Sequence, residues 1–554
     1  MVVGNAADSQ MAMAFEVLDY ALLSAPGAPL KQALLDVKAG KDVYGSYDDG
    51  ILQPYFTVIA KGSNPDRKEE FVSVIRQVLG DIVKNGIDRK AVEAGINYFE
   101  FRYREADFSS YPKGLMYSLD ILGDWLYEKG NPFAQVQQLT VFEKLKKAVN
   151  AGYFEELIRK YLLENPHGCI MTLVPKKGLA AQREKELEEK LEAYRSSLSE
   201  EQLDAMVEKT KALEAYQEAG EDPKALECIP MLKRSDIKRE AAKIINEELT
   251  VDDSLFLYHD VCTNGIGYVD LMFKTDSIAP EQIPYLGLLK SVLGYVDTEN
   301  YTYGELFNEI NANTGGINCG VEVFDRADST EEFQAMFSVR GKALYTKMDF
   351  LFKMIGEILN SSKLEDTKRL YEIVASVKSR AQVNLTGAGH STAVLRAAAY
   401  SSPMAAFQDE MAGIGYYQFI EKLEKDFEQR KEETVEELCK LMKKILRPEN
   451  FMISYTGERE SLETVQKLAG AVKAGLGTEP VEKSKEKLTC TKKNEGFKTS
   501  GQVQYVAQTG NFKKKGLEYT GALEILKVIL SYDYLWMNLR VKGGAYGCMS
   551  GFKR

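Results

Sequence analysis

Histidine is scarce in this 554-residue sequence, which contains only His167, His259 and His390. They lie too far apart for two of them to face one metal from adjacent helical turns, as H-x-x-E-H or H-E-x-x-H requires. We interpret His259, despite neighbouring Asp260 and Cys262, as structural. A G-x-S-x-G elbow, a P-loop and a G-x-G-x-x-G turn after a strand are also absent. The residues alone therefore contain no complete catalytic constellation.

Paired cysteines and long apolar runs are missing as well. Seven cysteines form no C-x-x-C pair, which predicts a reducing, cytoplasmic compartment and no structural zinc cluster. No run of about 18 apolar residues occurs, so we expect no membrane-spanning helix. The first residues carry Asp8, Glu16 and Asp19 and lack a basic segment, which argues against a signal peptide.

Basic residues are in the minority, with 71 Lys and Arg against 82 Asp and Glu and a net charge of −11. This balance disfavours a nucleic-acid or anionic-membrane partner. Proteins, peptides or small molecules are the expected partners. A chain of this length exceeds one hydrophobic core, which predicts several domains.

One order of elements occurs twice. Phe56 precedes Thr172 by the same number of residues as Phe337 precedes Ile453, which indicates an internal duplication of an α/β unit. The matching segments are strands at 55–60 and 335–341, amphipathic helices at 66–86 and 344–362, second helices from 88 and at 364–382, and closing strands at 168–175 and 450–457.

The second copy has a fuller beginning than the first. A strand at 264–275, a helix at 280–293 and a helix, glycine turn and strand at 302–324 precede its matching elements. The first copy starts at a helix containing Phe15 and Leu18. We expect that the chain lacks the natural beginning of this copy.

The segment between the copies, 179–225, is rich in Glu, Lys, Leu and Ala. Ser199 and Gln202 form a capping-box pattern that predicts the start of a second helix. We interpret the segment as a helical hairpin joining two halves. A solvated charged linker would explain the charge equally well, but the periodic leucines favour the hairpin.

A third unit follows a Lys- and Glu-rich stretch at 481–499. It contains a predicted strand at 502–510 and a helix with an apolar face that includes Ile525, Ile529 and Trp536. So few strands cannot cover such a helix. We therefore expect that the sequence is cut within this unit.

The helix runs into "RVKGGAYG". Arg540 carries a permanent charge and a forked set of donors, which suits a peptide carbonyl or carboxylate. Gly543 and Gly544 lack side chains and allow another backbone to come close. Tyr546 can donate its hydroxyl proton to a carbonyl oxygen or a developing oxyanion. The alternative is a glycine turn packed under a tyrosine.

"LWMNLRVKGGAYG" resembles the arginine and tyrosine motif of the pitrilysin and insulysin family of zinc metallopeptidases, most closely the branch with presequence protease and falcilysin. "LQPYFTVIAKGSNP", "TLVPKKG", "CIPMLKRSDI", "CTNGIGYVDLMF" and "NTGGI" resemble that branch in the same order. The resemblance implies an α+β fold of repeated metallopeptidase-type domains, each an antiparallel-rich sheet with helices on one face, in two halves joined by the hairpin. It implies a second family domain at 1–178, the hairpin at 179–225, a third domain at 226–479 and the start of a fourth at 480–554.

The resemblance also implies a zinc cofactor in the full-length family member, held by a first domain that is absent here, so this chain has no ligands for the metal. It implies catalytic roles for Arg540 and Tyr546, and substrate-binding roles for Gly543, Gly544 and Gly547. The expected partners are a peptide or unfolded polypeptide substrate and the missing N-terminal catalytic domain, with no nucleic acid and no membrane.

The leading hypothesis is a fragment of a zinc-dependent metalloendopeptidase that degrades peptides in a closed chamber. The chain would supply chamber wall, hinge and the distal Arg540 and Tyr546, and would be inactive alone. One alternative is a non-catalytic binding or assembly subunit of a split or degenerate peptidase. Another is a generic α/β interaction protein that resembles the family only in structure.

Overall fold

The computed structural model describes residues 1–127, 131–263, 265–326, 328–482, 484, 488–499 and 501–553. Parts of the predicted strand at 264–275 and of the stretch at 481–499 thus lie outside the described residues. The chain divides into two compact units. The first comprises residues 1–172, 245–499 and 505–509, and the second 173–244, 500–504 and 510–554.

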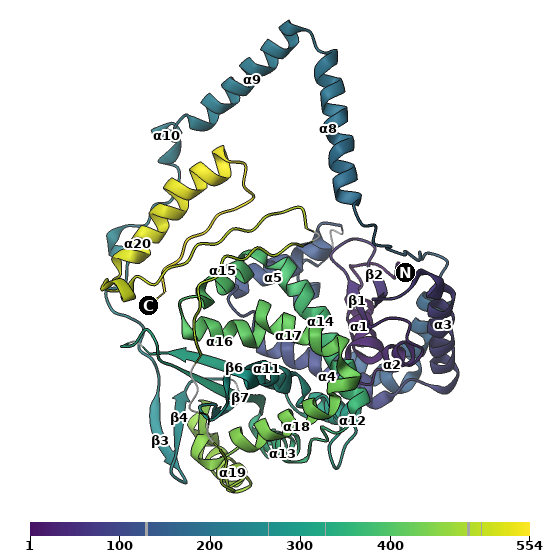
Figure 1. Cartoon of the computed structure of the whole chain (residues 1–554). Helices are drawn as coiled ribbons and strands as arrows, with labels where there is room; N and C mark the ends of the chain where they lie inside the picture. Colours follow the sequence, from purple (N-terminus) through teal and green to yellow (C-terminus); the bar gives the residue numbers. More distant parts are fainter. Residues whose placement is uncertain are drawn as a thin grey trace. The chain divides into compact units, whose positions relative to one another are not determined.

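A six-stranded sheet lies in the first unit, with the order β3-β4-β8-β5-β7-β6 (Figure 1). Neighbouring strands are antiparallel except for β4 and β8, which are parallel. Asp252 and Asp253 join β3 to β4 at φ 46° and 63°, a two-residue turn whose twist suits a hairpin. The strands are β3 Glu247–Val251, β4 Ser254–Asp260, β5 Ile266–Lys274, β6 Ile317–Asp325, β7 Phe333–Leu344 and β8 Phe451–Gly457.

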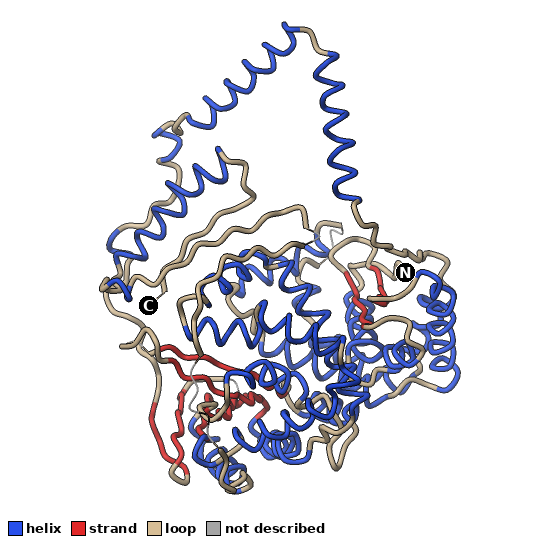
Figure 2. The backbone as a smooth tube through the Cα atoms, viewed as in Figure 1, coloured by secondary structure: helices blue, strands red, loops and turns tan. Residues whose placement is uncertain are grey.

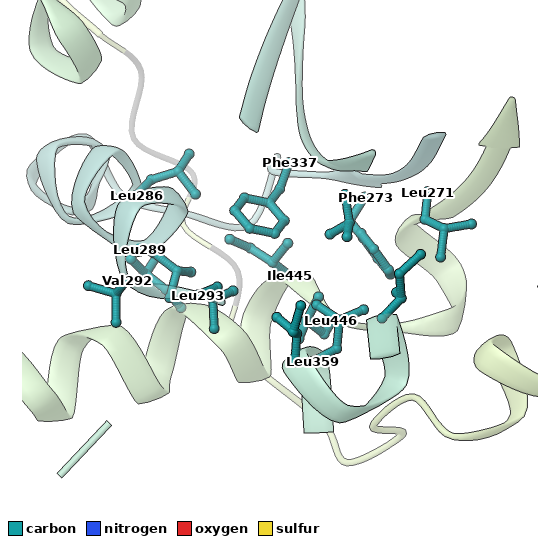
Figure 3. Close-up of a cluster of buried hydrophobic side chains, with 14 of the residues drawn as sticks. Leu271, Phe273, Leu286, Leu289, Val292, Leu293, Phe337, Leu359, Ile445 and Leu446 are labelled. Carbon is teal, nitrogen blue, oxygen red and sulfur yellow. The ribbon is translucent and has the colours of Figure 1, made fainter. Parts of the chain in front are cut away.

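Helices from the same region complete the core of this sheet. In α11, Ile283–Val292, side chains spaced three and four residues apart point to the sheet, and Leu286 and Leu289 lie near Phe337 of β7 (Figure 3). Ile445, at the end of α18 Phe427–Ile445, joins the same cluster. Other helices here are α12 Tyr303–Asn313, α13 Met348–Ser361, α14 Thr367–Gly387, α15 Gly389–Ala399, α16 Pro403–Ala412, α17 Ile414–Lys425 and α19 Leu462–Ala474.

Residues 1–172 form a second, mainly helical core. Its sheet has two antiparallel strands, β1 Asp42–Asp48 and β2 Tyr55–Lys61. Phe15, Phe56 and Phe142 are fully buried in it. The helices are α1 Ser9–Asp19, α2 Pro29–Asp36, α3 Lys68–Asn85, α4 Arg89–Glu105, α5 Lys113–Trp125, α6 Leu139–Ala148 and α7 Tyr153–Leu157.

An aromatic cluster joins residues 1–172 to the region of the six-stranded sheet. Tyr20 stacks on Phe307 of α12, with ring centroids 6.0 Å apart, and on Tyr98 of α4 at 5.5 Å. Lys342 of β7 lies 2.5 Å from the carboxylate of Glu105, whose side chain is 6% exposed. Apolar stacking and a largely buried ion pair therefore hold these regions in one unit.

The second unit contains long helices outside either core. They are α8 Leu179–Ser197 and α9 Glu200–Glu218, followed by the short α10 Pro223–Leu226. The side chain of Ser199 accepts from the backbone of Gln202, and the side chain of Gln202 accepts from the backbone of Ser199, which confirms the predicted capping box. No residue of α8 or α9 is buried.

The predicted α+β class is confirmed, and most predicted elements form. Figure 2 shows the mixture of helices and strands. The strands at 55–60, 335–341 and 450–457 correspond to β2, β7 and β8, and the strand–helix–helix order recurs as β2-α3-α4 and β7-α13-α14. The domain boundaries themselves stay predictions.

Two predicted strands are wrong. Residues 168–175 and 502–510 are extended or irregular and are assigned to no sheet. Ile170, Met171 and Leu173 in the first segment are exposed. An alternating pattern supplies a strand's side chains, but a strand forms only where a neighbour accepts its hydrogen bonds, and in the described structure neither segment has one.

Candidate functional site

The predicted motif lies at the end of the last long helix. This helix begins as α20, Ala522–Ile529, and continues with π-helical hydrogen bonding as η12, Leu530–Lys542. The turn that ends it is built on glycine: Gly544 has φ +70°, and the N–H of Ala545 donates to the carbonyl of Leu539 at 2.9 Å. The predicted helix is thus confirmed, and the glycines end it.

The two motif glycines differ in what they permit. A Cβ at Gly543 would lie 2.8 Å from the carbonyl oxygen of Leu539, so a side chain there would push against the helix backbone. Gly544 has open space around it but a left-handed conformation that other residues rarely adopt. A Cβ at Gly547 would meet nothing within 4 Å. Only Gly543 and Gly544 therefore have a local structural reason to be glycine.

Arg540 is half-buried in the last turn of η12. Its guanidinium carbon lies 5.8 Å from the ring centroid of Trp536, one turn earlier. The cation is favoured both by the ring and by the partial negative charge at the helix C-terminus. Nearby, Lys542 forms a 3.0 Å ion pair with Glu218 at the end of α9. The forked donors of Arg540 have no ion-pair partner within the described residues.

Tyr546 is 92% exposed, beyond the glycine turn. Its hydroxyl has no hydrogen-bond partner in the part of the chain that the structure describes. The segment after it folds back: the Oγ atoms of Ser550 and Ser531 lie 2.8 Å apart, and Ser550 donates to the carbonyl of Lys527 at 3.3 Å. The phenol is therefore presented to solvent and is not packed over the turn.

The structure thus places Arg540, Gly543, Gly544, Tyr546 and Gly547 around one turn, as their spacing requires. The packed-turn alternative, in which the tyrosine covers the glycines, does not fit an almost fully exposed Tyr546. What the arrangement offers chemically is a permanent cation and a hydroxyl donor, both available to a ligand that carries carbonyl or carboxylate oxygens.

The residues of this chain do not fit a zinc site. Both ring nitrogens of His259 are engaged: Nδ1 lies 2.8 Å from the carbonyl of Ile245, and Nε2 lies 3.1 Å from Ser454 Oγ. Within the described ranges, no group of three or more His, Cys, Asp or Glu side chains is arranged to hold a metal. Zinc needs at least three protein ligands, so no chemical step is derived through it here.

Apolar side chains are exposed along the helices of the second unit. Leu187, Leu191 and Tyr194 on α8 are each more than half exposed. On α20 and η12 the predicted apolar face is likewise uncovered, with Ile525 65% exposed. An isolated helix presenting such a face is typical of an element that another part of a protein or a partner covers.

Sequence reasoning missed a cavity in the first unit. Ser254, Lys274, Arg447 and Lys473 line it, although they are distributed over more than two hundred residues of sequence. No motif connects them. The only local signal is an arginine between the end of a helix and the start of a strand, which is too common to indicate a site.

None of the helices described for the chain combines the length and apolar composition needed to cross a bilayer. Comparison with protein families gives a match of residues 173–423 to a family of domains described as associated with the peptidases of metallopeptidase family 16, subfamily C.

Similar curated proteins match the chain from end to end. "Protein HypA" of Clostridium perfringens is 38% identical over 100% of this chain and 56% of its own length. "Presequence protease 1, chloroplastic/mitochondrial" of Arabidopsis thaliana is 28% identical over 98% of this chain and 51% of its own length. The chain therefore spans about half the length of the curated relatives it matches.

Among solved structures, "Crystal Structure of pitrilysin" aligns with a TM-score of 0.39 and 12% identity, over 88% of this chain and 47% of that chain.

Proposed function

The chain belongs to the pitrilysin and presequence protease-like family of peptidases, and from that premise we propose that it is part of a zinc-dependent metalloendopeptidase that degrades peptides and unfolded segments. The observation that carries the proposal is the end-to-end similarity to two longer relatives, one of them named a presequence protease. The family premise supplies the reaction class, and the zinc-binding domain would lie outside this sequence.

In this proposal the chain supplies chamber wall, hinge and substrate contacts. The helices α8 and α9 would act as the hinge between two halves. Their uncovered apolar side chains support a role in contacting other parts of the enzyme.

Arg540 and Tyr546 would bind the substrate backbone. The guanidinium of Arg540 donates in a fork to a peptide carbonyl, and the hydroxyl of Tyr546 donates to the carbonyl oxygen as negative charge develops on it. Gly543, Gly544 and Gly547 leave room for the substrate chain. The exposure of Tyr546 supports this role, because a phenol already packed in the turn would have to be released first.

The direct test joins this chain to the parts of the Clostridium perfringens relative that it does not match, and measures cleavage of a quenched fluorogenic peptide. We expect chelator-sensitive cleavage by the joined protein and none by the chain alone. Circular dichroism and gel filtration confirm that the joined protein is folded. Tight stoichiometric zinc and chelator-sensitive cleavage by the chain alone would contradict the proposal.

The same joined protein tests the motif. Tyr546→Phe should lower kcat by roughly a hundredfold, the usual effect of losing one oxyanion donor. Tyr534→Phe is the matched control, because Tyr534 is an exposed tyrosine on the same helix and should leave kcat unchanged. If both variants turned over like the parent, the catalytic role of Tyr546 would be refuted.

A non-catalytic binding or assembly subunit is the second candidate, and the exposed apolar faces of α8, α9 and α20 favour it. It predicts a stable complex with a zinc-bearing chain whose activity does not change when Tyr546 or Arg540 is replaced.

A further inference from the structure

A cavity of about 570 Å³ lies at one end of the six-stranded sheet. There β4 and β8 begin and β5 ends, because β8 runs parallel to β4 and antiparallel to β5. The loop after α18 and the segment after α19 close its sides. The volume is typical of small-molecule sites, and the sheet topology alone brings these distant parts of the chain together. The residues that carry its chemistry are Ser254, Lys274, Arg447 and Lys473.

Positive charge predominates in the wall, with three cations against Asp253 and Glu449. The side chain of Arg447 is only 8% exposed and is held rigidly: its Nε donates to Glu449 at 2.6 Å and its Nη1 to the carbonyl of Glu479 at 2.5 Å. Burying a guanidinium requires such partners. Its carboxylate partner neutralises Arg447 in part, so the two lysines provide the uncompensated charge.

The lysines hold different positions at this wall. Lys473 donates to the backbone carbonyl of Asp252, which fixes its ammonium beside the β3-β4 turn. Lys274, the last residue of β5, is exposed and has no hydrogen bond or ion pair from its side chain with the residues that the structure describes. An anion entering the cavity would gain a charge-assisted hydrogen bond from Lys274 without breaking an existing pair.

Ser254 provides an independent observation. The residue is 3% exposed and lines the cavity, yet its hydroxyl has no partner within the described chain. A buried hydroxyl without a hydrogen bond is destabilising unless something satisfies it. A ligand oxygen in the cavity would satisfy it.

From these features we propose that the cavity binds a small organic anion, with a carboxylate or phosphate group facing Lys274, Lys473 and Ser254. The apolar body of the ligand packs against Phe451 and Met452 on the same wall. This site does not depend on peptidase activity. Since Thr478 lines the cavity and Glu479 is bound by Arg447, an occupant also orders the chain just after α19.

The test is isothermal titration calorimetry on the full chain with AMP, with N-acetyl-leucyl-leucine and with inorganic phosphate. Adenosine and the dipeptide amide, which lack the anionic group, are the paired controls. Binding of AMP or of the free dipeptide, but not of its neutral partner, supports the proposal and identifies the source of the anion. Binding of phosphate alone, or of no probe at millimolar concentration, overturns it.

Variants locate the site. Lys274→Gln should weaken binding about tenfold, the effect of losing one charge-assisted hydrogen bond. Lys467→Gln is the matched control, an exposed lysine on α19 outside the cavity wall, and should bind like the parent. Ser254→Ala should weaken binding without lowering the melting temperature, because the hydroxyl has no partner to lose. Equal weakening by both lysine variants would refute the assigned position.

Hydrogen exchange supplies the last readout. Ligand binding should slow amide exchange in residues 475–482, which include the segment that Arg447 holds. Slowing confined to another region would show that the ligand binds elsewhere.

Discussion

Replacing Glu16 with glutamine should make helix α1 more stable at alkaline pH. Burial, and after it the nearby carboxylates of Asp49 and Asp19, raise the pKa of the Glu16 carboxyl from 4.5 to about 7, with Arg102 acting in the opposite direction. The folded protein therefore binds this proton more tightly than the unfolded chain. Glutamine resembles the protonated carboxyl in shape and cannot ionise.

The direction of the pH effect follows from this difference. Below pH 4.5 the carboxyl is protonated in both states, and its contribution to folding stability is fully present. As the pH rises from 4.5 to about 7, the unfolded chain releases the proton first, so the contribution is progressively lost. A tenfold change in acidity corresponds to about 1.4 kcal/mol, so the full shift corresponds to about 3 kcal/mol at pH 8.

Amide hydrogen exchange of residues 9–19, followed by mass spectrometry, measures this effect. At each pH the parent and Glu16→Gln share nearly the same intrinsic exchange rate, so their ratio reports the difference in opening free energy. We expect near-equal exchange at pH 5 and roughly hundredfold slower exchange of the variant at pH 8.

Glu93→Gln is the control, because Glu93 is an exposed carboxylate on α4. It should exchange like the parent at every pH. A parent-to-Glu16→Gln ratio that stays constant from pH 5 to pH 8 would refute the reasoning, since it would mean that the carboxyl does not change its proton affinity on folding.

Two further predictions concern contacts within each unit. Glu424 is 5% exposed and pairs with Lys41 and with Lys378, the latter at 3.1 Å, so Glu424→Gln should leave a partly buried cation cluster and destabilise the first unit by about 1–2 kcal/mol. Faster exchange of β1 amides would report it, and unchanged exchange would contradict it. Gly544→Ala should cost about 1 kcal/mol, because φ is +70° there, and should speed exchange at residues 538–542. Gly551→Ala, without a positive φ, should not, and an equal effect of both variants would disprove the conformational explanation.

Local chemistry was readable where a few neighbouring residues decide the outcome. The serine and glutamine of the capping box at 199–202 satisfy each other's backbone donors in the structure as the pattern predicts. Gly86 ends α3 at φ +93°, and the apolar spacing of the helix from 522 onwards reflects its real helical face. These features depend on contacts within one or two turns, which sequence order specifies.

Strands were harder, because a strand depends on a neighbour that can be far away in sequence. The alternating segment 450–457 becomes β8 because β4 and β5 flank it. The comparable segments 168–175 and 502–510 pair with no described strand. Conversely, β1 has the polar sequence "DVYGSYD" and was not predicted, yet it forms because β2 lies beside it along its whole length.

The sequence by itself determined the α+β class, the positions of most helices, and the family to which the chain is similar, because amphipathic spacing, caps and motif residues are local properties. Only the tertiary structure decided that Tyr546 faces solvent beyond a left-handed glycine, and that Ser254, Lys274, Arg447 and Lys473 share one cavity. The physical reason is that burial and charge proximity arise from long-range packing, in which strand order brings distant residues to one end of a sheet.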